Sequence, residues 1–109
     1  MAIVAVSVVP IGTAGTSVSS YVARAEKVLR DDGRVSYEIG PMFTTLQGEI
    51  ADCLDVVRRM HESLFAAGAL RVSTSVKIDD RRDRNADMKQ KVISVEEKLR
   101  EMEVRGTEP

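Results

Sequence analysis

Several polar side chains that could bind a small molecule lie beside apolar residues on three predicted strands. Alternate residues of a strand point to the same face, so three of these side chains share one side of the segment 43–49. The others lie on an earlier, valine-rich strand and on a later strand. Amide, carboxylate, guanidinium and hydroxyl groups beside valines are typical of a pocket for a small polar heterocycle. The residues are Ser7, Thr45, Gln47, Glu49, Arg71 and Ser73.

A shared pocket requires that these side chains meet in space. If the end of the first strand, the end of the third and the start of the fourth share one edge of a sheet, we expect Gln47, Glu49, Arg71 and Ser7 to converge there. The alternative is ordinary hydrogen bonding at a subunit interface, and the spacing by itself favours that alternative.

The residues that most often perform catalysis are isolated in this sequence. His61, the one histidine, lies on an apolar helical stripe without an adjacent nucleophile, and we interpret it as a core or interface residue. Cys53, the one cysteine, is predicted to be a small buried hydrophobe. These counts exclude an internal disulfide and a Cys/His metal cluster. We therefore expect no metal, no cofactor and no enzyme activity, over the alternative that His61 or Glu49 acts as an acid or base.

Two further segments could bind ions. Residues 12–17 hold two glycines between a strand and a helix, but they lack the lysine of a P-loop and the third glycine of a dinucleotide fingerprint. We interpret them as a capped loop whose amides could receive a small anion. Residues 77–84 include seven charged side chains of both signs and do not follow the calcium-loop pattern. They are either a solvated run or an intersubunit ion-pair network.

Length and composition indicate one folded domain over residues 1–109. The chain is 43% hydrophobic and 30% charged, which is too apolar for a disordered protein. Sixteen basic and seventeen acidic residues leave a net charge of −1, which argues against a general nucleic-acid binder. The apolar run 1–10 has no basic flank and about half the ~20 residues of a membrane span. We expect no membrane association and a cytoplasmic location.

Hydrophobic periodicity predicts a regular order of elements. We expect strands at 2–9, 35–39, 43–49 and 70–79, and helices at 18–30, 50–67 and 86–104. Gly33 and Gly68 follow the first two helices as expected for helix ends. In the strand 70–79, Leu70, Val72, Val76 and Ile78 are predicted to share one side. This order predicts an α+β fold, a ferredoxin-like βαββαβ antiparallel sandwich with an extra C-terminal helix.

Apolar surface remains in this fold after the two helices cover one sheet face. The first strand is apolar on both sides, so we expect a second subunit to cover the open face. The last helix carries an apolar stripe with 4-3-4-3 spacing, but it holds fewer than three heptads. We therefore favour docking on its own sheet or on a neighbouring subunit over a coiled coil. The stripe consists of Met88, Val92, Val95, Leu99 and Met102.

A series of short motifs resembles the thiamine-binding protein family related to YkoF. They preserve order and spacing from about residue 4 to residue 99, and the ordered set carries the resemblance because no single motif is diagnostic. The motifs are Val8-Val9-Pro10-Ile11-Gly12, Ser17-Val18-Ser19, Gly40-Pro41-Met42-Phe43-Thr44, Gln47-Gly48-Glu49, His61-Glu62, Gly68-Ala69-Leu70-Arg71-Val72 and the run 77–83.

The resemblance implies a ferredoxin-like homo-oligomer, commonly a tetramer of paired dimers, that binds thiamine or its hydroxymethylpyrimidine moiety without catalysis. Such a protein would serve thiamine salvage or transport, and its pyrimidine site is expected near the subunit interface. The alternative is an oligomeric interaction or regulatory module without a small-molecule ligand. The predicted ligand-binding residues are Ser7, Phe43, Thr44, Thr45, Gln47, Glu49, Arg71 and Ser73.

Two residues depart from the family pattern. Gln47 stands where the family commonly has Glu, and Phe43 stands where it commonly has Gly. A carboxylate would suit a protonated aminopyrimidine, whereas Gln47 donates and accepts hydrogen bonds without charge complementarity. Phe43 fills space or supplies a ring for stacking.

Overall fold

The computed structural model describes residues 1–12, 18–83 and 88–107, with side chains described as far as Val104. The loop predicted at 12–17 therefore lies outside the described residues except for Gly12. The elements are β1 (Ala2–Pro10), α1 (Ser19–Asp32), β2 (Ser36–Ile39), β3 (Thr44–Gly48), α2 (Ile50–Ala66), β4 (Val72–Asp80) and α3 (Met88–Thr107).

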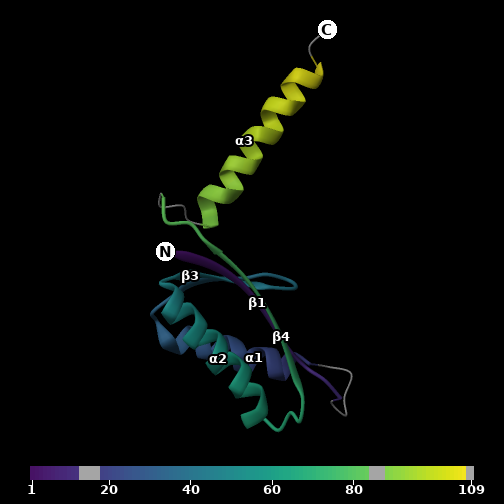
Figure 1. The fold of residues 1–109 in the computed structure, drawn as a ribbon. Helices are drawn as coiled ribbons and strands as arrows, with labels where there is room; N and C mark the ends of the chain where they lie inside the picture. The colour runs from purple at the N-terminus through teal and green to yellow at the C-terminus, as the bar shows by residue number, and fades with distance from the viewer. Residues whose placement is uncertain (13–17, 84–87, 108–109) are drawn as a thin grey trace.

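The strands form one antiparallel sheet in the order β2-β3-β1-β4. Helices α1 and α2 lie together on one face of this sheet, and α3 extends away from it (Figure 1). This arrangement confirms the predicted α+β, ferredoxin-like fold with an additional C-terminal helix. No described helix is long and apolar enough to cross a membrane.

The core lies between the sheet and the two helices. Alternate residues of β1, including Val4 and Val6, are buried on the helix side because side chains of a strand alternate between faces. Leu46 of β3 and Leu64 of α2 are also fully buried. The opposite faces of β1 and β3 form the open face of the sheet, which we define as Ile3, Ala5, Ser7, Val9, Thr45 and Gln47.

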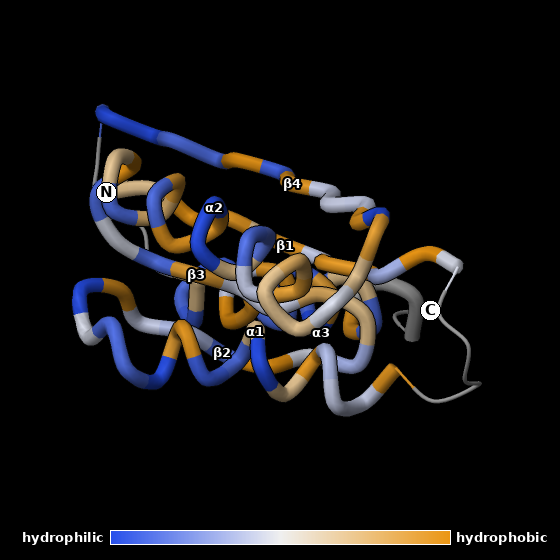
Figure 2. Tube along the Cα trace, turned by 90° about the horizontal axis from the view of Figure 1, so that it is seen from below, coloured by the Kyte–Doolittle hydropathy of each residue, from blue (hydrophilic) through white to orange (hydrophobic). Residues whose placement is uncertain are grey.

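Strand β4 differs from its predicted form. It begins at Val72, and Leu70 lies before it with 96% of its surface exposed, so the prediction that Leu70 belongs to the strand is wrong. Val76 and Ile78 face the helix side but stay exposed. Helix α2 contacts the early part of β4, where His61 Nδ1 lies 2.6 Å from Thr74 Oγ1, and the later part extends past it. Figure 2 shows apolar and polar residues alternating along β4.

Helix α3 is attached to the rest of the protein at its first turn. The Met88 N–H donates a hydrogen bond to Gln47 Oε1 at 3.2 Å, and Lys91 forms an ion pair with Asp79. The rest of the helix projects away from the sheet, so the prediction that it docks on its own sheet is wrong (Figure 1). The physical reason is that the contacts of the first turn with Gln47 and Asp79 hold the helix at one end of the sheet, with its axis directed away from both sheet faces (Figure 1). Docking on a neighbouring subunit stays a prediction.

The charged run after β4 pairs locally. Arg81 binds Asp83, and Arg82 binds Asp80 at 2.9 Å, so each guanidinium has a carboxylate two residues away. These exposed pairs fit the interpretation of a solvated run, and Arg84 lies outside the described residues. The alternative of an intersubunit ion-pair network stays a prediction.

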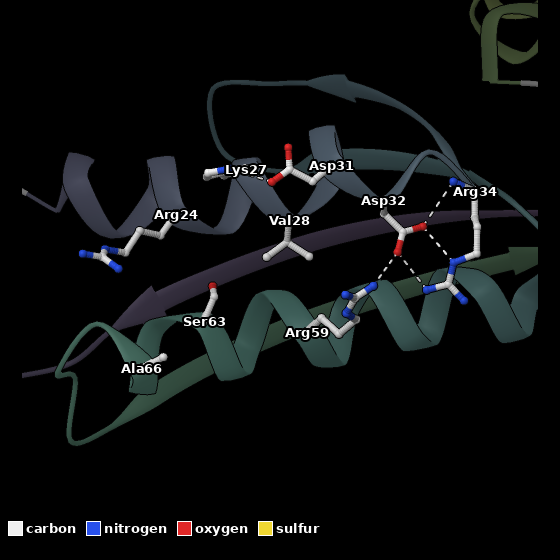
Figure 3. A pocket seen from close by; sticks show the side chains of 9 residues that line it. All are labelled: Arg24, Lys27, Val28, Asp31, Asp32, Arg34, Arg59, Ser63 and Ala66. Carbon is white, nitrogen blue, oxygen red and sulfur yellow. Dashed lines mark hydrogen bonds and ion pairs between the residues drawn. The ribbon is translucent and has the colours of Figure 1, made fainter.

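An ion-pair network joins α1 to α2 on the outer side of the helices (Figure 3). The Asp32 side chain is only 2% exposed, and it accepts hydrogen bonds from Arg34 at 2.8 Å and from Arg59 at 2.7 Å. Arg34 also reaches Asp55 of α2 at 2.6 Å. The hydrogen bond from the Arg34 guanidinium is the main reason that the pKa of Asp32 is lowered to about 2. This network therefore stabilises the helix pair while Asp32 is ionised.

Asp32→Asn is expected to lower the free energy of unfolding by roughly 1–2 kcal/mol at neutral pH, since it removes a charged partner from two guanidinium groups. The folded pKa lies below the ordinary value of 3.8. The contribution of Asp32 is therefore complete above the unfolded pKa and is lost as the pH falls from about 4 through about 2. Urea unfolding of both proteins across this range measures the difference.

Asp31→Asn is the matched control for this prediction. Asp31 pairs with Lys27 on the surface, with side chains 60% and 72% exposed, and such pairs contribute little. We expect this variant to unfold like the unmodified chain at each pH. A constant difference between Asp32→Asn and the unmodified protein from neutral to acidic pH would contradict the assigned role of the ionised carboxylate.

Candidate functional site

A cavity of about 220 Å³ lies between α1, the end of β1 and the turn that joins β2 to β3. Its volume is below the ~300–1,000 Å³ of pockets for drug-sized ligands, so it suits a single small ring. Most of its lining is apolar, and the polar side chains on the helix side of the sheet are those of Glu26 and Thr44, whereas the side chain of Ser7 alternates to the open face. The lining residues are Val6, Ser7, Val8, Val9, Val22, Ala25, Glu26, Ile39, Gly40, Pro41, Met42, Thr44 and Met60.

Glu26 is the charged group of this cavity. Its Oε1 atom accepts a hydrogen bond from the Thr44 hydroxyl at 2.7 Å. Its Oε2 atom is buried without a hydrogen-bond partner among the described residues. A buried polar atom without a partner costs about 1–3 kcal/mol, and more when it is charged. The carboxylate is therefore held by Thr44 with one oxygen available to a donor from a ligand.

The positions of Glu26 and Thr44 follow from local structure. Residues three or four apart share one face of a helix, so Glu26 lies on the same side of α1 as Val22, Ala25 and Leu29, of which the last two are buried. Thr44 pairs with Val6 of β1, which places both side chains on the helix face of the sheet. The helix and strand thus bring a carboxylate and a hydroxyl together from residues 18 positions apart.

The β2–β3 turn over the cavity depends on Gly40. The Gly40 N–H donates a hydrogen bond to the Phe43 carbonyl at 3.0 Å. A Cβ atom at position 40 would lie 2.5 Å from the Phe43 carbonyl oxygen, closer than real Cβ atoms approach. The turn therefore requires glycine here, and it holds Pro41 and Met42 against the cavity.

The predicted ligand residues lie in separate regions of the structure. The prediction that Gln47 and Glu49 meet Arg71 and Ser7 is therefore wrong. Gln47 pairs with Ile3 at the start of β1, whereas the Arg71 carbonyl accepts the Ile11 N–H beyond the end of that strand. Because both neighbours of β1 run antiparallel to it, the end of β3 and the start of β4 lie at opposite ends of β1. Ser73 pairs with Val9 near the end of β1, whereas Gln47 pairs with Ile3 near its start, so these two residues are also separated along the sheet.

Two members of the predicted set, Ser7 and Thr44, line the 220 Å³ cavity. Thr45 lies on the open face, and the exposed Phe43 lies in the adjoining turn without lining the cavity. Gln47 lines a different cavity of about 340 Å³ beside the first residues of α3. Its Nε2 atom donates to Met1 Sδ at 3.2 Å, and its Oε1 atom accepts from Met88, so both ends of its amide are occupied.

The two isolated reactive residues have structural roles. Cys53 is fully buried, as predicted, and burial raises the pKa of its thiol. His61 is half-buried, bonds to Thr74 and packs edge-on against Phe65 with 5.3 Å between ring centroids, which fits the predicted core or interface role. Within the described ranges, no three His, Cys, Asp or Glu side chains are grouped to hold a metal ion.

Glu26 was absent from the predicted site, although the sequence contains a signal for it. An acidic residue on the inward stripe of an amphipathic helix is unusual, because ionised carboxylates are rarely buried without a partner. Val22, Ala25 and Leu29 define that stripe, and Glu26 lies within it. The hydroxyl partner, however, comes from β3 and is identified only by the fold.

A larger cavity of about 540 Å³ lies on the outer side of α1 and α2 (Figure 3). Its lining includes Asp31, Asp32, Lys27, Arg34 and Arg59, which already pair with one another. The lining also includes Arg24, so this cavity is basic and its carboxylates are paired, whereas the smaller cavity holds a buried carboxylate oxygen without a hydrogen-bond partner among the described residues. The smaller cavity is therefore the better candidate for ligand recognition.

The family model described as thiamine-binding protein matches residues 4–96, nearly the whole chain. This chain belongs to the thiamine-binding protein family. Two similar family relatives are UPF0045 proteins. One, from Staphylococcus xylosus, is 43% identical over 91% of this chain and 95% of its own length. The other, YqgV of Bacillus subtilis, is 41% identical over 91% of this chain and 98% of its own length.

Solved structures agree with this membership of the thiamine-binding protein family. A Bacillus cereus domain of unknown function, DUF77, is 40% identical with a TM-score of 0.76, covering 84% of this chain and 86% of that chain. A Thermotoga maritima protein, described as a candidate thiamine biosynthesis/salvage protein, is 26% identical with a TM-score of 0.72 over 86% of this chain and 97% of its own.

Proposed function

We propose that this member of the thiamine-binding protein family binds the aminopyrimidine ring of thiamine or of hydroxymethylpyrimidine in the 220 Å³ cavity. The observation that carries the proposal is the buried Glu26 Oε2 atom without a hydrogen-bond partner among the described residues. An aminopyrimidine offers an amino N–H and, when protonated, a ring N–H, which are the donors that a carboxylate accepts best. The family description and the salvage description of the Thermotoga maritima protein support the same ligand class.

The cavity favours recognition of the pyrimidine alone. Valine and methionine side chains would contact the ring faces, and Glu26 with Thr44 would bind its polar edge. The remainder of thiamine would extend outside a cavity of about 220 Å³. We infer from the family description a binding protein without catalysis, with a role in thiamine salvage or transport. A cytoplasmic location stays a prediction.

A homo-oligomer is part of this proposal. The open face carries Ile3, Ala5 and Val9 of β1, and a second subunit would remove this apolar surface from water. We propose a dimer of dimers in which this face is an interface. A chain that sediments as a monomer at micromolar concentration contradicts that assembly.

Calorimetric titration with thiamine and with hydroxymethylpyrimidine tests the ligand. We expect both to bind one per chain with similar affinity, because they share the ring that Glu26 recognises. The matched control is the thiazole moiety alone, which lacks the amino edge and is expected to release no heat. Absence of heat and of a thermal shift with millimolar thiamine and hydroxymethylpyrimidine would contradict the proposal and favour an interaction module without a small-molecule ligand.

A further inference from the structure

Helix α3 carries an apolar stripe that the described part of this chain leaves uncovered. Its 20 residues correspond to about 30 Å of helix, and it projects away from the sheet beyond its first turn (Figure 1). Val92, Val95, Leu99 and Met102 are 58%, 58%, 52% and 69% exposed. A stripe of this kind indicates a partner helix or groove in the assembled protein.

The stripe has the spacing of a coiled-coil seam. Intervals of four and three residues from Met88 to Met102 place Val92 and Leu99 at a positions and Met88, Val95 and Met102 at d positions. The periodicity therefore describes a seam for one other helix rather than a broad face for a sheet.

The charges beside the seam specify a second copy of the same helix in parallel orientation. Lys91 and Lys98 occupy g positions, and Glu96 and Glu103 occupy the e positions five residues later. In a parallel pair, each g residue faces the e residue five positions along the partner helix. Lys98 of one copy would then face Glu103 of the other, so this contact joins opposite charges, whereas Lys91 is already paired with Asp79 of its own chain.

An antiparallel pair is electrostatically unfavourable for the same helix. It brings g positions opposite g positions and e positions opposite e positions. At the centre of the contact, Lys98 of one helix would face Lys98 of the other. Glu96 of one helix would likewise face Glu96 of the other. Like charges placed opposite one another are destabilising.

We propose that the α3 helices of two copies pair in parallel as a short two-stranded coiled coil through Val92, Val95, Leu99 and Met102. The inference is independent of the ligand proposed for the cavity, and it concerns a surface separate from the open face of the sheet. The ion pair of Lys91 with Asp79 and the hydrogen bond from Met88 to Gln47 hold the first turn, so the seam has a fixed direction relative to the sheet.

Leu99→Cys tests the pairing and its orientation together. In a parallel pair the two introduced thiols face each other across the seam, and we expect a covalent dimer in a glutathione redox buffer at equilibrium. The native Cys53 is fully buried and does not compete. Glu97→Cys is the matched control, because its f position faces away from the seam and is expected to give little covalent dimer. Equal amounts of dimer from the two variants would overturn the proposal.

Charge exchange in the Leu99→Cys background tests the specificity. Lys98→Glu is expected to lower the equilibrium constant for the covalent dimer roughly tenfold, because two attractive contacts become repulsive. Adding Glu103→Lys restores opposite charges across the seam and is expected to restore the covalent dimer. Circular dichroism checks that each variant keeps its helix. A double variant that stays as weak as Lys98→Glu would overturn the parallel register.

Discussion

Glu26→Gln is expected to weaken hydroxymethylpyrimidine binding by about 10- to 100-fold. Hydrogen bonds to a charged group contribute about 1.5–3 kcal/mol, and the amide keeps the size of the side chain while it removes the charge. The variant is expected to remain folded, since burying a neutral amide costs less than burying a carboxylate. Calorimetry measures the affinity, and thermal unfolding without ligand checks the fold.

Gln47→Glu is the contrasting variant for this experiment. A carboxylate at position 47 would strengthen binding of a cationic ligand if Gln47 touched the pyrimidine. Gln47 instead lines a separate cavity and bonds to Met1 and Met88, so we expect an unchanged affinity. Stronger binding by Gln47→Glu, together with unchanged binding by Glu26→Gln, would move the site from the 220 Å³ cavity to the open face.

Leu46→Ala is expected to lower the free energy of unfolding by about 3 kcal/mol, within the ~2–5 kcal/mol of buried leucine truncations. Leu46 is completely buried at the centre of the sheet, where it pairs with Val4 of β1 and Tyr37 of β2. Its loss leaves a cavity between three strands and the helices. Urea unfolding followed by circular dichroism measures the change.

Leu70→Ala is the matched control for Leu46→Ala. The sequence assigns both leucines to strands, but Leu70 is 96% exposed, and its truncation is expected to change stability by less than about 0.5 kcal/mol. A loss at Leu70 as large as that at Leu46 would show that the surface around Leu70 is buried in the assembled protein. That outcome would place a subunit contact at the start of β4.

Local signals in the sequence were sufficient for the elements and their order. The valine-rich run of β1 indicates a strand, and Gly33 adopts the left-handed conformation at the end of α1, as predicted, although the helix ends at Asp32 and not at residue 30. These features depend on residues close together in the chain, where periodicity and backbone preference act directly. The resemblance to the thiamine-binding protein family rested on the same kind of information, namely ordered motifs, and the family match confirms it.

The predicted site was less successful because its geometry depends on the direction of every strand. Gln47 and Arg71 were expected to meet, but antiparallel pairing on both sides of β1 separates them by nearly the length of that strand. Ser7 and Thr44 line the same cavity, which depends on strand pairing and is not visible in the periodicity of the sequence. The carboxylate beside them, Glu26, lies within the apolar stripe of α1, and the periodicity of that stripe does not identify its partner in β3.

The sequence by itself determined the fold class, the burial of Cys53 and the family. It also contained the heptad pattern of α3. Only the tertiary structure decided that Glu26 meets Thr44, that Gln47 bonds to the first turn of α3, and that α3 stands away from its own sheet. The physical reason is that periodicity shows which side of an element is apolar, whereas strand pairing and helix packing decide which sides face one another.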